Sequence, residues 1–272
     1  MSEWCYGHDA HAVRDCWRMC LRSAGACTAE DFPAGVLFDL DGTLLDTASD
    51  MAGALNALLI EEGRAPLPFE QLRPSVSHGA LALVRLGFGT LIEPELSQLR
   101  ARFLDLYGRR LTRETRIYAG LPRALDHLDR AGIRWGIVTN KPGFLTEPLL
   151  EHLGLRARAQ VVVSGDTLPQ RKPHPAQLLH AAAQLELPPG KCLYIGDAER
   201  DVLAARAAGM HVWVALFGYI PAAERPLEWP AHGWLHTPRE LAELLLSMRR
   251  DLDQPSASRS DSMSRADSAM KD

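Results

Sequence analysis

Short apolar runs alternate with helix-like segments along most of this chain, and this alternation constrains the fold more than any other feature. The apolar runs occupy residues 36–38, 133–139, 161–164, 192–196 and 211–216. They are bounded by Gly, Asp, Asn or Pro, as is typical of strands buried on both faces of a parallel sheet. Segments 121–132, 175–185 and 200–209 have apolar residues at helical spacing, and two of them end at glycine. The pattern predicts a doubly wound, Rossmann-like α/β fold.

One long interval, residues 47–116, breaks the alternation. It contains no convincing strand pattern, whereas leucines recur at helical spacing around residues 55–59 and 96–106. Ligands of open α/β sheets bind beyond the carboxyl ends of the strands, so an insertion that leaves from there overhangs the site. We therefore expect a helical cap at 47–116, inserted after the first strand of an α/β core that spans 35–46 and 117–252.

The two ends of the chain lack both patterns. Residues 1–34 have no regular period, and residues 253–272 are mostly Ser, Asp, Arg and Met, so we expect a flexible extension and a disordered tail. Four of the five cysteines fall in the first thirty residues, which argues against a disulfide framework. The alternative for the extension is a zinc site formed by His8, His11, Cys16 and Cys20. The two histidines are closer together than in the usual zinc finger, which disfavours that site.

The overall composition excludes several classes of partner. Of the 272 residues, 46% are hydrophobic and 24% charged, as in ordinary globular proteins, and no apolar run is long enough to cross a bilayer. The formal charge of -4 gives no general attraction for nucleic acid or for an anionic membrane surface. The N-terminus lacks the apolar stretch of a secretory signal, so we expect a cytoplasmic protein. Both a monomer and a homodimer remain open.

The first apolar run leads directly into two carboxylates, in V-L-F-D-L-D-G-T-L-L-D-T. Asp39 and Asp41 are two residues apart, so they point to the same side if the strand persists that far. An EF-hand loop is excluded because its sixth and twelfth positions would hold Leu44 and Asp50. A plain Asp-Gly turn is the alternative. Two close carboxylates repel unless a cation is present, and Mg²⁺ on Asp39 would leave Asp41 free to exchange a proton.

Three further polar groups follow other predicted strands. Asp197, with Asp201 and Glu199 near it in G-D-A-E-R-D, adds carboxylates for a metal, although Glu199 could equally face solvent. Thr139 and Asn140 provide a hydroxyl and backbone donors for phosphate, and Lys172 in Q-R-K-P-H-P provides a positive charge. For each of these residues there is an alternative without a functional role: Lys172 could be a solvated surface lysine, and Thr139 an ordinary end of a strand. Polar clusters at four successive strand ends together indicate one phosphate site.

The order of the motifs D-L-D-G-T, V-T-N, K-P-H-P and G-D-A-E-R-D resembles that of the haloacid dehalogenase-like hydrolase superfamily, over residues 35–245. The resemblance implies that Asp39 attacks phosphorus to form an aspartyl-phosphate. It implies that Asp41 protonates the leaving oxygen and then activates water. Thr139, Asn140 and Lys172 would bind and steady the phosphoryl group. The implied cofactor is Mg²⁺, and the resemblance assigns it to Asp39, the backbone carbonyl of Asp41 and Asp197, with Asp201 in support.

Within that superfamily the motifs favour phosphate esters as substrates. Carbon–halogen hydrolases generally lack the second aspartate, so Asp41 indicates a small phosphorylated metabolite. The segments W-G-I-V-T-N-K-P and R-K-P-H-P are similar to those of bacterial phosphoglycolate phosphatases, which implies hydrolysis of 2-phosphoglycolate to glycolate and phosphate. The alternatives are an N-acetylmuramic acid 6-phosphate phosphatase, which is similar in W-G-I-V-T-N-K-P and F-G-Y-I, a sugar phosphomutase, and a non-catalytic phosphate-binding module. The residues Asp39, Asp41, Lys172 and Asp197 are all present, which disfavours the binding module.

The cap is expected to contribute to substrate choice. Its loop S-V-S-H-G, residues 75–79, should enter the site and offer Ser77 or His78 to the substrate, although a solvated histidine is the alternative for His78. We also expect the cap to close and reopen, with hinges near residues 45–47 and 118–120, because water must be excluded during attack and admitted for hydrolysis.

Overall fold

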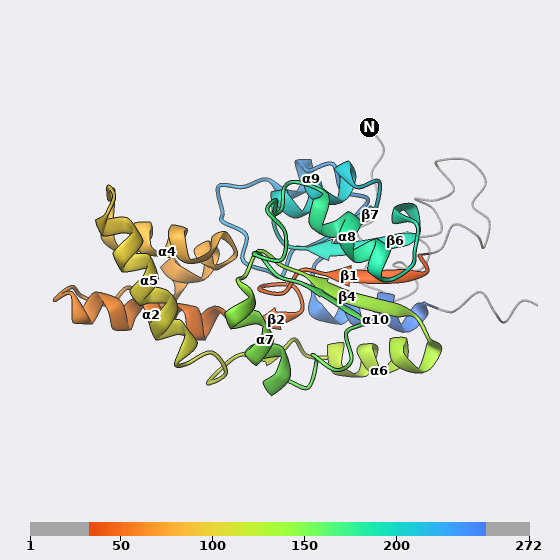
Figure 1. The fold of residues 1–272 in the computed structure, drawn as a ribbon, viewed down its shortest axis with the longest axis horizontal. Coiled ribbons are helices and arrows are strands. Elements are labelled where there is room, and N and C mark those ends of the chain that lie inside the picture. The colour runs from red at the N-terminus through yellow and green to blue at the C-terminus, as the bar shows by residue number, and fades with distance from the viewer. Residues whose placement is uncertain (1–32, 249–272) are drawn as a thin grey trace, which may run out of the picture.

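A parallel sheet of six strands forms the centre of the structure, a computed structural model that describes residues 33–248 (Figure 1). Its strands are β1 (Gly35–Phe38), β4 (Arg134–Val138), β5 (Val161–Val163), β6 (Cys192–Gly196), β7 (His211–Ala215) and β8 (Gly233–Leu235). Their spatial order is β5-β4-β1-β6-β7-β8, so the sheet grows outward from β1 in both directions. The predicted doubly wound sheet is confirmed. Most of the predicted N-terminal extension and all of the predicted tail lie outside the described residues.

Helices cover both faces of this sheet (Figure 1). One face carries α8 (Ala176–Gln184) and α9 (Glu199–Ala207), and the other carries α6 (Leu121–Ala131), α7 (Gly143–His152) and α10 (Pro238–Ser247). Short 3₁₀ turns η3 (Pro189–Lys191) and η4 (Pro226–Glu228) complete the core. Strand side chains alternate between the faces: Phe38 packs on the α6 side and Leu37 on the α8 side. Within residues 33–248, no helix has both the length and the apolar character that crossing a bilayer requires.

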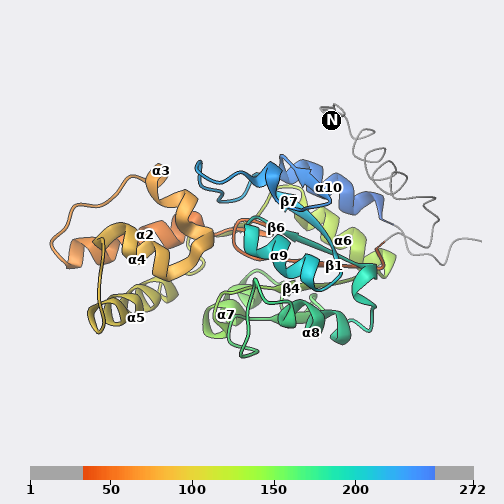
Figure 2. The same ribbon diagram turned by 90° about the horizontal axis from the view of Figure 1, so that it is seen from above.

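A separate group of helices follows the first strand, and we call it the cap. It consists of α2 (Ala48–Glu61), α3 (Phe69–Leu72), the 3₁₀ turn η2 (Arg73–His78), α4 (Gly79–Phe88) and α5 (Glu95–Gly108). Figure 2 shows these helices side by side beyond one end of the sheet. The chain leaves for the cap through β2 (Leu45–Asp46) and returns through β3 (Arg116–Ile117), and these two short strands pair antiparallel.

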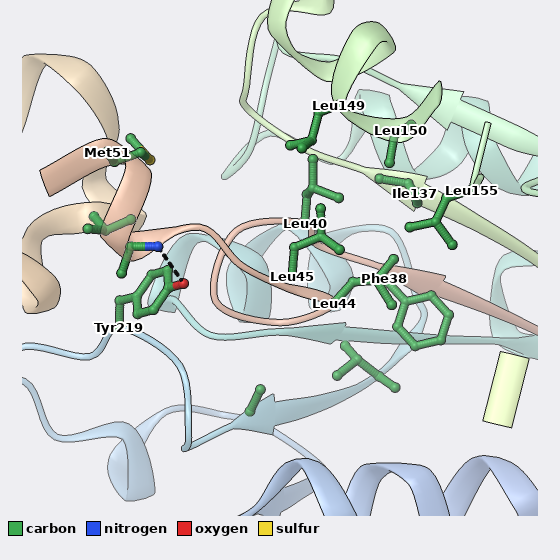
Figure 3. Packing of buried hydrophobic residues seen from close by; sticks show 14 of the residues in the cluster. Phe38, Leu40, Leu44, Leu45, Met51, Ile137, Leu149, Leu150, Leu155 and Tyr219 are labelled. Atoms are coloured by element: carbon green, nitrogen blue, oxygen red, sulfur yellow. Dashed lines mark hydrogen bonds between the residues drawn. The ribbon is translucent and has the colours of Figure 1, made fainter. Parts of the chain in front are cut away.

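The turn that follows β1 is held by apolar side chains. Leu40, Leu44 and Leu45 are fully buried in the cluster that contains Phe38 (Figure 3). The amides of Leu44 and Leu45 both donate to the carbonyl of Leu40, which closes the turn. Gly42 has φ +82°, and a Cβ there would lie 2.2 Å from Asp197 Oδ2, so only glycine fits. The backbone on either side of Asp41 is therefore tightly constrained.

Candidate active site

Three carboxylates meet at the carboxyl ends of β1 and β6. Asp39 follows β1, whereas Asp197 and Asp201 follow β6, and one oxygen of each lies within 4.8 Å of the others. All three side chains are buried. The amide of Asp39 donates to the carbonyl of Ile195 at 2.8 Å, so the β1–β6 pairing continues as far as Asp39. The two acidic strand ends noted in the sequence therefore form one cluster.

Lys172 places a cation against this cluster. Its Nζ lies 2.8 Å from Asp39 Oδ1 and 2.8 Å from Asp201 Oδ1. The same nitrogen donates to the carbonyl of Val138 at 2.9 Å and to the hydroxyl of Tyr194 at 2.8 Å. The lysine side chain is completely buried, so its charge is little screened by solvent. One lysine thus partly neutralises two of the three carboxylates.

Crowding separates the pKa values of the three carboxyl groups. Burial, together with the neighbouring Asp39 and Asp201, raises the pKa of Asp197 to about 7. Burial also raises the pKa of Asp39, although Lys172 opposes it. Burial acts in the same direction on Asp201, but Lys172 and Arg200 outweigh it and lower the pKa of Asp201. Three ionised carboxylates at this spacing therefore need more positive charge than Lys172 and Arg200 supply.

The oxygens of Asp197 indicate what would supply that charge. Oδ2 accepts hydrogen bonds from Ser77 Oγ at 2.5 Å and from the amide of Tyr219 at 2.8 Å. Oδ1 is buried and has no hydrogen-bond partner among the described residues. An orphaned carboxylate oxygen beside two more carboxylates has the donor chemistry that a hard divalent cation requires. The three aspartates therefore fit a metal ion.

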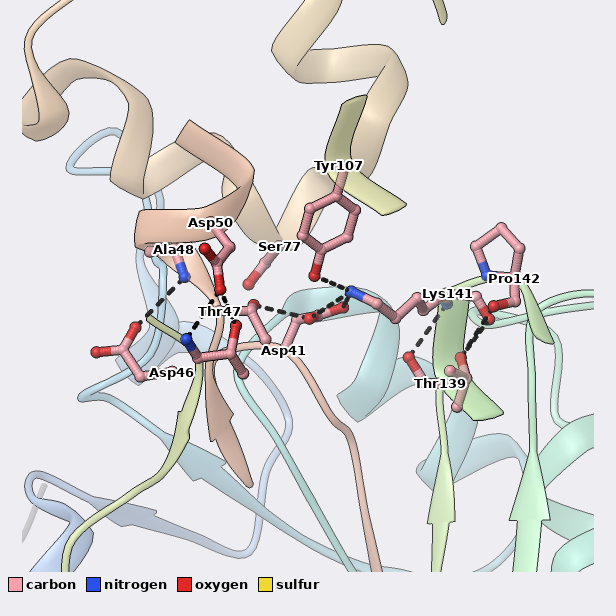
Figure 4. Close-up of polar contacts among 12 residues, drawn as sticks. Asp41, Asp46, Thr47, Ala48, Asp50, Ser77, Tyr107, Thr139, Lys141 and Pro142 are labelled. Atoms are coloured by element: carbon pink, nitrogen blue, oxygen red, sulfur yellow. Dashed lines mark hydrogen bonds and ion pairs between the residues drawn. The ribbon is translucent and has the colours of Figure 1, made fainter. Parts of the chain in front are cut away.

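Asp41 is held by a different cation (Figure 4). Lys141 Nζ lies 2.9 Å from Asp41 Oδ1 and 3.2 Å from Oδ2, and Thr47 Oγ1 donates to Oδ1 at 2.7 Å. The Asp41 side chain is 16% exposed, whereas that of Asp39 is 4% exposed. The two aspartates thus keep separate lysine partners although they are only two residues apart.

Lys141 also connects the core to the cap. Its Nζ lies 2.7 Å from the hydroxyl of Tyr107, which belongs to α5, and 4.5 Å from the centre of the Tyr107 ring. Burial lowers the pKa of Lys141, but Asp41 and Tyr107 outweigh burial and raise that pKa above its ordinary value. Burial raises the pKa of Tyr107 well above its ordinary value. Lys141 is therefore a buried cation and Tyr107 a neutral phenol at pH 7.

Thr139 and Asn140 support the backbone that carries the two lysines. Thr139 Oγ1 accepts from the amide of Lys141 at 3.1 Å, and the Thr139 amide donates to the carbonyl of Val163 at 2.9 Å. Asn140 Nδ2 donates to the carbonyl of Lys172 at 3.0 Å, while its buried Oδ1 has no partner within the described part of the chain. Both residues directly follow β4, so they lie at the same edge of the sheet as Asp39.

Of the two residues predicted in the cap loop, Ser77 lies at the carboxylate cluster and His78 does not. Ser77 is buried at the carboxylate cluster, and its carbonyl accepts from Arg200 Nη2 at 2.6 Å. His78 Nε2 instead lies 3.1 Å from Glu224 Oε1, with 40% of the histidine side chain exposed, and is not part of the cluster. Glu199, whose role the sequence left open, is exposed in the first turn of α9.

Lys141, Tyr107 and Tyr219 were not singled out from the sequence as site residues. Tyr219, in the loop after β7, accepts from the amides of Thr47 at 2.7 Å and Ala48 at 3.1 Å, so it anchors the start of α2 (Figure 3). Lys141 stands next to Thr139 and Asn140 in V-T-N-K-P, which was the available signal. Tyr107 follows Phe103 at helical spacing, which indicates only a packed helix face.

Three comparisons place the chain among known proteins. Residues 36–215 match the family model described as haloacid dehalogenase-like hydrolase. The chain is 44% identical over 212 residues to a phosphoglycolate phosphatase of Xanthomonas campestris pv. campestris (strain 8004), covering 78% of this chain and 96% of that protein. It is 40% identical over 211 residues to an N-acetylmuramic acid 6-phosphate phosphatase of Pseudomonas aeruginosa, covering 77% and 93%. The fold is similar to a crystal structure described as a predicted phosphoglycolate phosphatase from Haemophilus somnus 129pt, with a TM-score of 0.71, 26% identity and coverage of 80% and 98%.

Proposed function

The chain belongs to the haloacid dehalogenase-like hydrolase family and is a phosphoric monoester hydrolase, and from this premise we propose that it converts 2-phosphoglycolate to glycolate and phosphate. The proposed route runs through an aspartyl-phosphate on Asp39, with Mg²⁺ as cofactor. The observation that carries the proposal is the separation of the two aspartates: Asp39 contacts Lys172, whereas Asp41 contacts Lys141. Two neighbouring carboxyl groups in different environments can serve as nucleophile and as acid or base.

In the first step, a carboxylate oxygen of Asp39 attacks phosphorus and the bond from phosphorus to the ester oxygen breaks. Asp41 gives its proton to that ester oxygen, and the alcohol leaves. Lys172 stays beside the nucleophile and stabilises the negative charge of the phosphoryl group. Backbone donors and the hydroxyl at Thr139, together with Asn140, are the groups proposed to orient the phosphoryl oxygens.

In the second step, Asp41 takes a proton from water, and the water oxygen attacks phosphorus. The bond between phosphorus and Asp39 breaks, which releases inorganic phosphate and restores both carboxyl groups. Asp39, Asp197 and the carbonyl of Asp41 would hold Mg²⁺, with Asp201 in support. A bound Mg²⁺ supplies positive charge that stabilises the transferring phosphoryl group.

A second candidate substrate is N-acetylmuramic acid 6-phosphate, and the relative at 40% identity from Pseudomonas aeruginosa favours it. Both candidates are phosphate esters of molecules that also carry a carboxylate. They differ in where that carboxylate lies: next to the ester carbon in 2-phosphoglycolate, and on a distant sugar substituent in the other. The same residues of the core would carry out the chemistry on either ester.

The test is phosphate release from both esters, with and without Mg²⁺. We expect Mg²⁺-dependent turnover and a preference for 2-phosphoglycolate of more than about tenfold in kcat/KM. Asp39→Asn should lower kcat by at least about 10⁴-fold, because it removes the nucleophile. The matched control is Asp126→Asn, which changes an exposed carboxylate of α6 that pairs with Arg158. An Asp39→Asn variant as active as the control would overturn the covalent mechanism.

A further inference from the structure

We propose that Lys141 and Tyr107 bind a carboxylate of the leaving group and make the enzyme selective for phosphate esters of 2-hydroxy carboxylic acids. In such esters the carboxylate is attached to the carbon that bears the ester oxygen. This inference rests on the proposed function, because it takes Asp41 to be the group that protonates the ester oxygen. It concerns the part of the substrate that leaves, whereas the roles proposed above for Asp39 and Lys172 concern the phosphoryl group.

Lys141 is a buried cation whose proposed part in the phosphoryl chemistry is limited to its contact with Asp41. Its side chain is 4% exposed, and a buried ammonium group is costly unless it is paired and hydrogen-bonded. Lys172 already serves Asp39 and the phosphoryl group. Lys141 stands on the other side, between Asp41 and the cap (Figure 4). Its position therefore suits a second negative group, on the part of the substrate that Asp41 protonates.

Distance limits where on the substrate that negative group can be. To protonate the ester oxygen, Asp41 must lie within hydrogen-bond reach of it, and Lys141 Nζ is 2.9 Å from the same carboxylate. Lys141 Nζ is then roughly two hydrogen-bond lengths, about 6 Å, from the ester oxygen. A carboxylate on the ester carbon falls inside that range. A carboxylate on a remote ring substituent is not held at a fixed short distance from the ester oxygen.

Tyr107 adds a hydrogen-bond donor to the same place. A lysine ammonium group only donates, so in the 2.7 Å contact the Tyr107 oxygen accepts from Lys141. The hydrogen of the Tyr107 hydroxyl has no acceptor among the residues that the structure describes. A cation and a free phenolic donor side by side can bind the two oxygens of one carboxylate. The longer of the Lys141–Asp41 contacts, at 3.2 Å, is the weaker one and can be exchanged for it.

The two groups come from different parts of the molecule, so the subsite is complete only when the cap lies against the core. Lys141 follows β4 of the core, whereas Tyr107 lies in the last turn of α5. A substrate carboxylate that binds both would favour the closed arrangement. The cap would then contribute to selectivity by completing the subsite and would leave the reacting carboxylates in place.

The experiment compares 2-phosphoglycolate with 2-hydroxyethyl phosphate, in which a neutral hydroxymethyl group replaces the carboxylate. The full chain is assayed with Mg²⁺ as the parent, Lys141→Met, Lys141→Arg and Tyr107→Phe. The control is Lys191→Met, a lysine in η3 whose carbonyl accepts from Ala34 at the opposite end of β1. The quantity measured is the ratio of kcat/KM for the two esters, which cancels any common loss caused by the contact with Asp41.

We expect the parent to prefer 2-phosphoglycolate by more than about 100-fold, since one buried charged pair contributes that much discrimination. Lys141→Met should reduce the ratio by at least about 30-fold, and Tyr107→Phe by about threefold to tenfold. Lys141→Arg should retain part of the preference because it keeps the charge. Lys191→Met should leave the ratio unchanged.

Two results would overturn the subsite while the phosphatase function stands. One is a parent that turns over both esters without preference, and the other is a Lys141→Met ratio equal to that of the parent. A parent inactive on both esters overturns the proposed function and the subsite with it. Should Lys141→Met lose all turnover, calorimetric Kd values in the Asp39→Asn background decide: loss of affinity for 2-phosphoglycolate alone supports the subsite, and equal loss for both esters overturns it.

Discussion

The core and the cap both contribute side chains to the same site, but these side chains are positioned in different ways. In the core, Asp39 extends the β1–β6 pairing by one residue, and Lys172 makes four polar contacts from a fully buried position. From the cap, the Ser77 hydroxyl contacts Asp197 and the Tyr107 hydroxyl contacts Lys141. Asp39 cannot shift without breaking its hydrogen bond to β6, whereas Ser77 and Tyr107 belong to cap elements that lie outside the sheet.

This difference indicates a division of work between the two regions. Groups that react with phosphorus must stay within a fraction of an ångström of their positions, and strand ends provide that. Groups that contact the leaving group can arrive and depart with the cap. Changes in the core should therefore abolish turnover, and changes in the cap should alter its efficiency.

The largest effect on stability is expected from removing the buried lysine that contacts Asp39 and Asp201. Lys172→Met leaves Asp39 and Asp201 buried without their lysine, so the free energy of unfolding should fall by about 3–5 kcal/mol. Turnover should fall by at least about 100-fold as the phosphoryl group loses a stabilising charge. Urea unfolding and phosphate release measure the two effects, with Lys191→Met as the control. If the free energy of unfolding fell by less than about 1 kcal/mol, Lys172 would not be needed to stabilise the buried carboxylates of the core.

A smaller effect is expected at the base of the cap. Asp50 of α2 is buried, and its Oδ2 accepts from the amides of Glu114 and Thr115 and from Thr115 Oγ1. Asp50→Ala leaves these donors without their acceptor and should lower the free energy of unfolding by about 2–3 kcal/mol. It should raise KM by several-fold and change kcat much less than Lys172→Met does, because it loosens only the cap.

Steady-state kinetics and urea unfolding test this expectation. The control is Asp105→Ala, which removes an exposed carboxylate of α5 that pairs with Arg109. If Asp50→Ala lowered kcat as strongly as Lys172→Met, the cap would share in the chemistry and the division between the two regions would be wrong.

The smallest effect is expected at His232, beside β7 and away from the cap. Burial, together with the nearby His211 and Arg206, lowers the pKa of His232 to about 4, and its Nδ1 accepts from the amide of Val212 at 3.0 Å. Between pH 4 and the ordinary pKa near 6.5, the unfolded chain binds the proton and the folded chain does not, so stability falls as pH falls. The ring is only partly buried, so solvent screening reduces the effect to about 1 kcal/mol.

The measurement is urea unfolding of the parent and of His232→Gln at pH 7 and pH 5. The parent should lose about 1 kcal/mol more than the variant between these values. Equal losses in the two proteins would mean that His232 is not the source of the pH dependence.

The sequence was informative where local pattern and sheet geometry act together. Apolar runs bounded by Asp and Gly predicted the parallel strands, and the carboxyl ends of neighbouring parallel strands share one edge. Asp39 and Asp197 could therefore be expected to lie close together. The strand β8 was missed because Gly233–Leu235 is short and has no apolar run before it.

The contacts between core and cap could not be predicted in the same way. Tyr107 and Lys141 are 34 positions apart, and Lys141 and Asp41 are 100 positions apart. Their meeting depends on how α5 crosses the end of the sheet, and helical spacing in the sequence does not specify that crossing. The pairing of His78 with Glu224, rather than with the carboxylate cluster, depends on a loop path that no periodic pattern encodes.

The short pair formed by β2 and β3 has a consequence for how such a chain can change over time. Leu45 pairs with Ile117 and Asp46 with Arg116, so the exit to the cap and the return from it are fastened together at their base. The inserted helices therefore form a closed loop between two paired chain segments. The entropic cost of closing a loop grows only slowly with its length. An insertion fastened in this way can be lengthened, shortened or exchanged during evolution without disturbing the strand ends. New substrates can then be acquired by exchanging the cap helices while the carboxylates at the strand ends are kept.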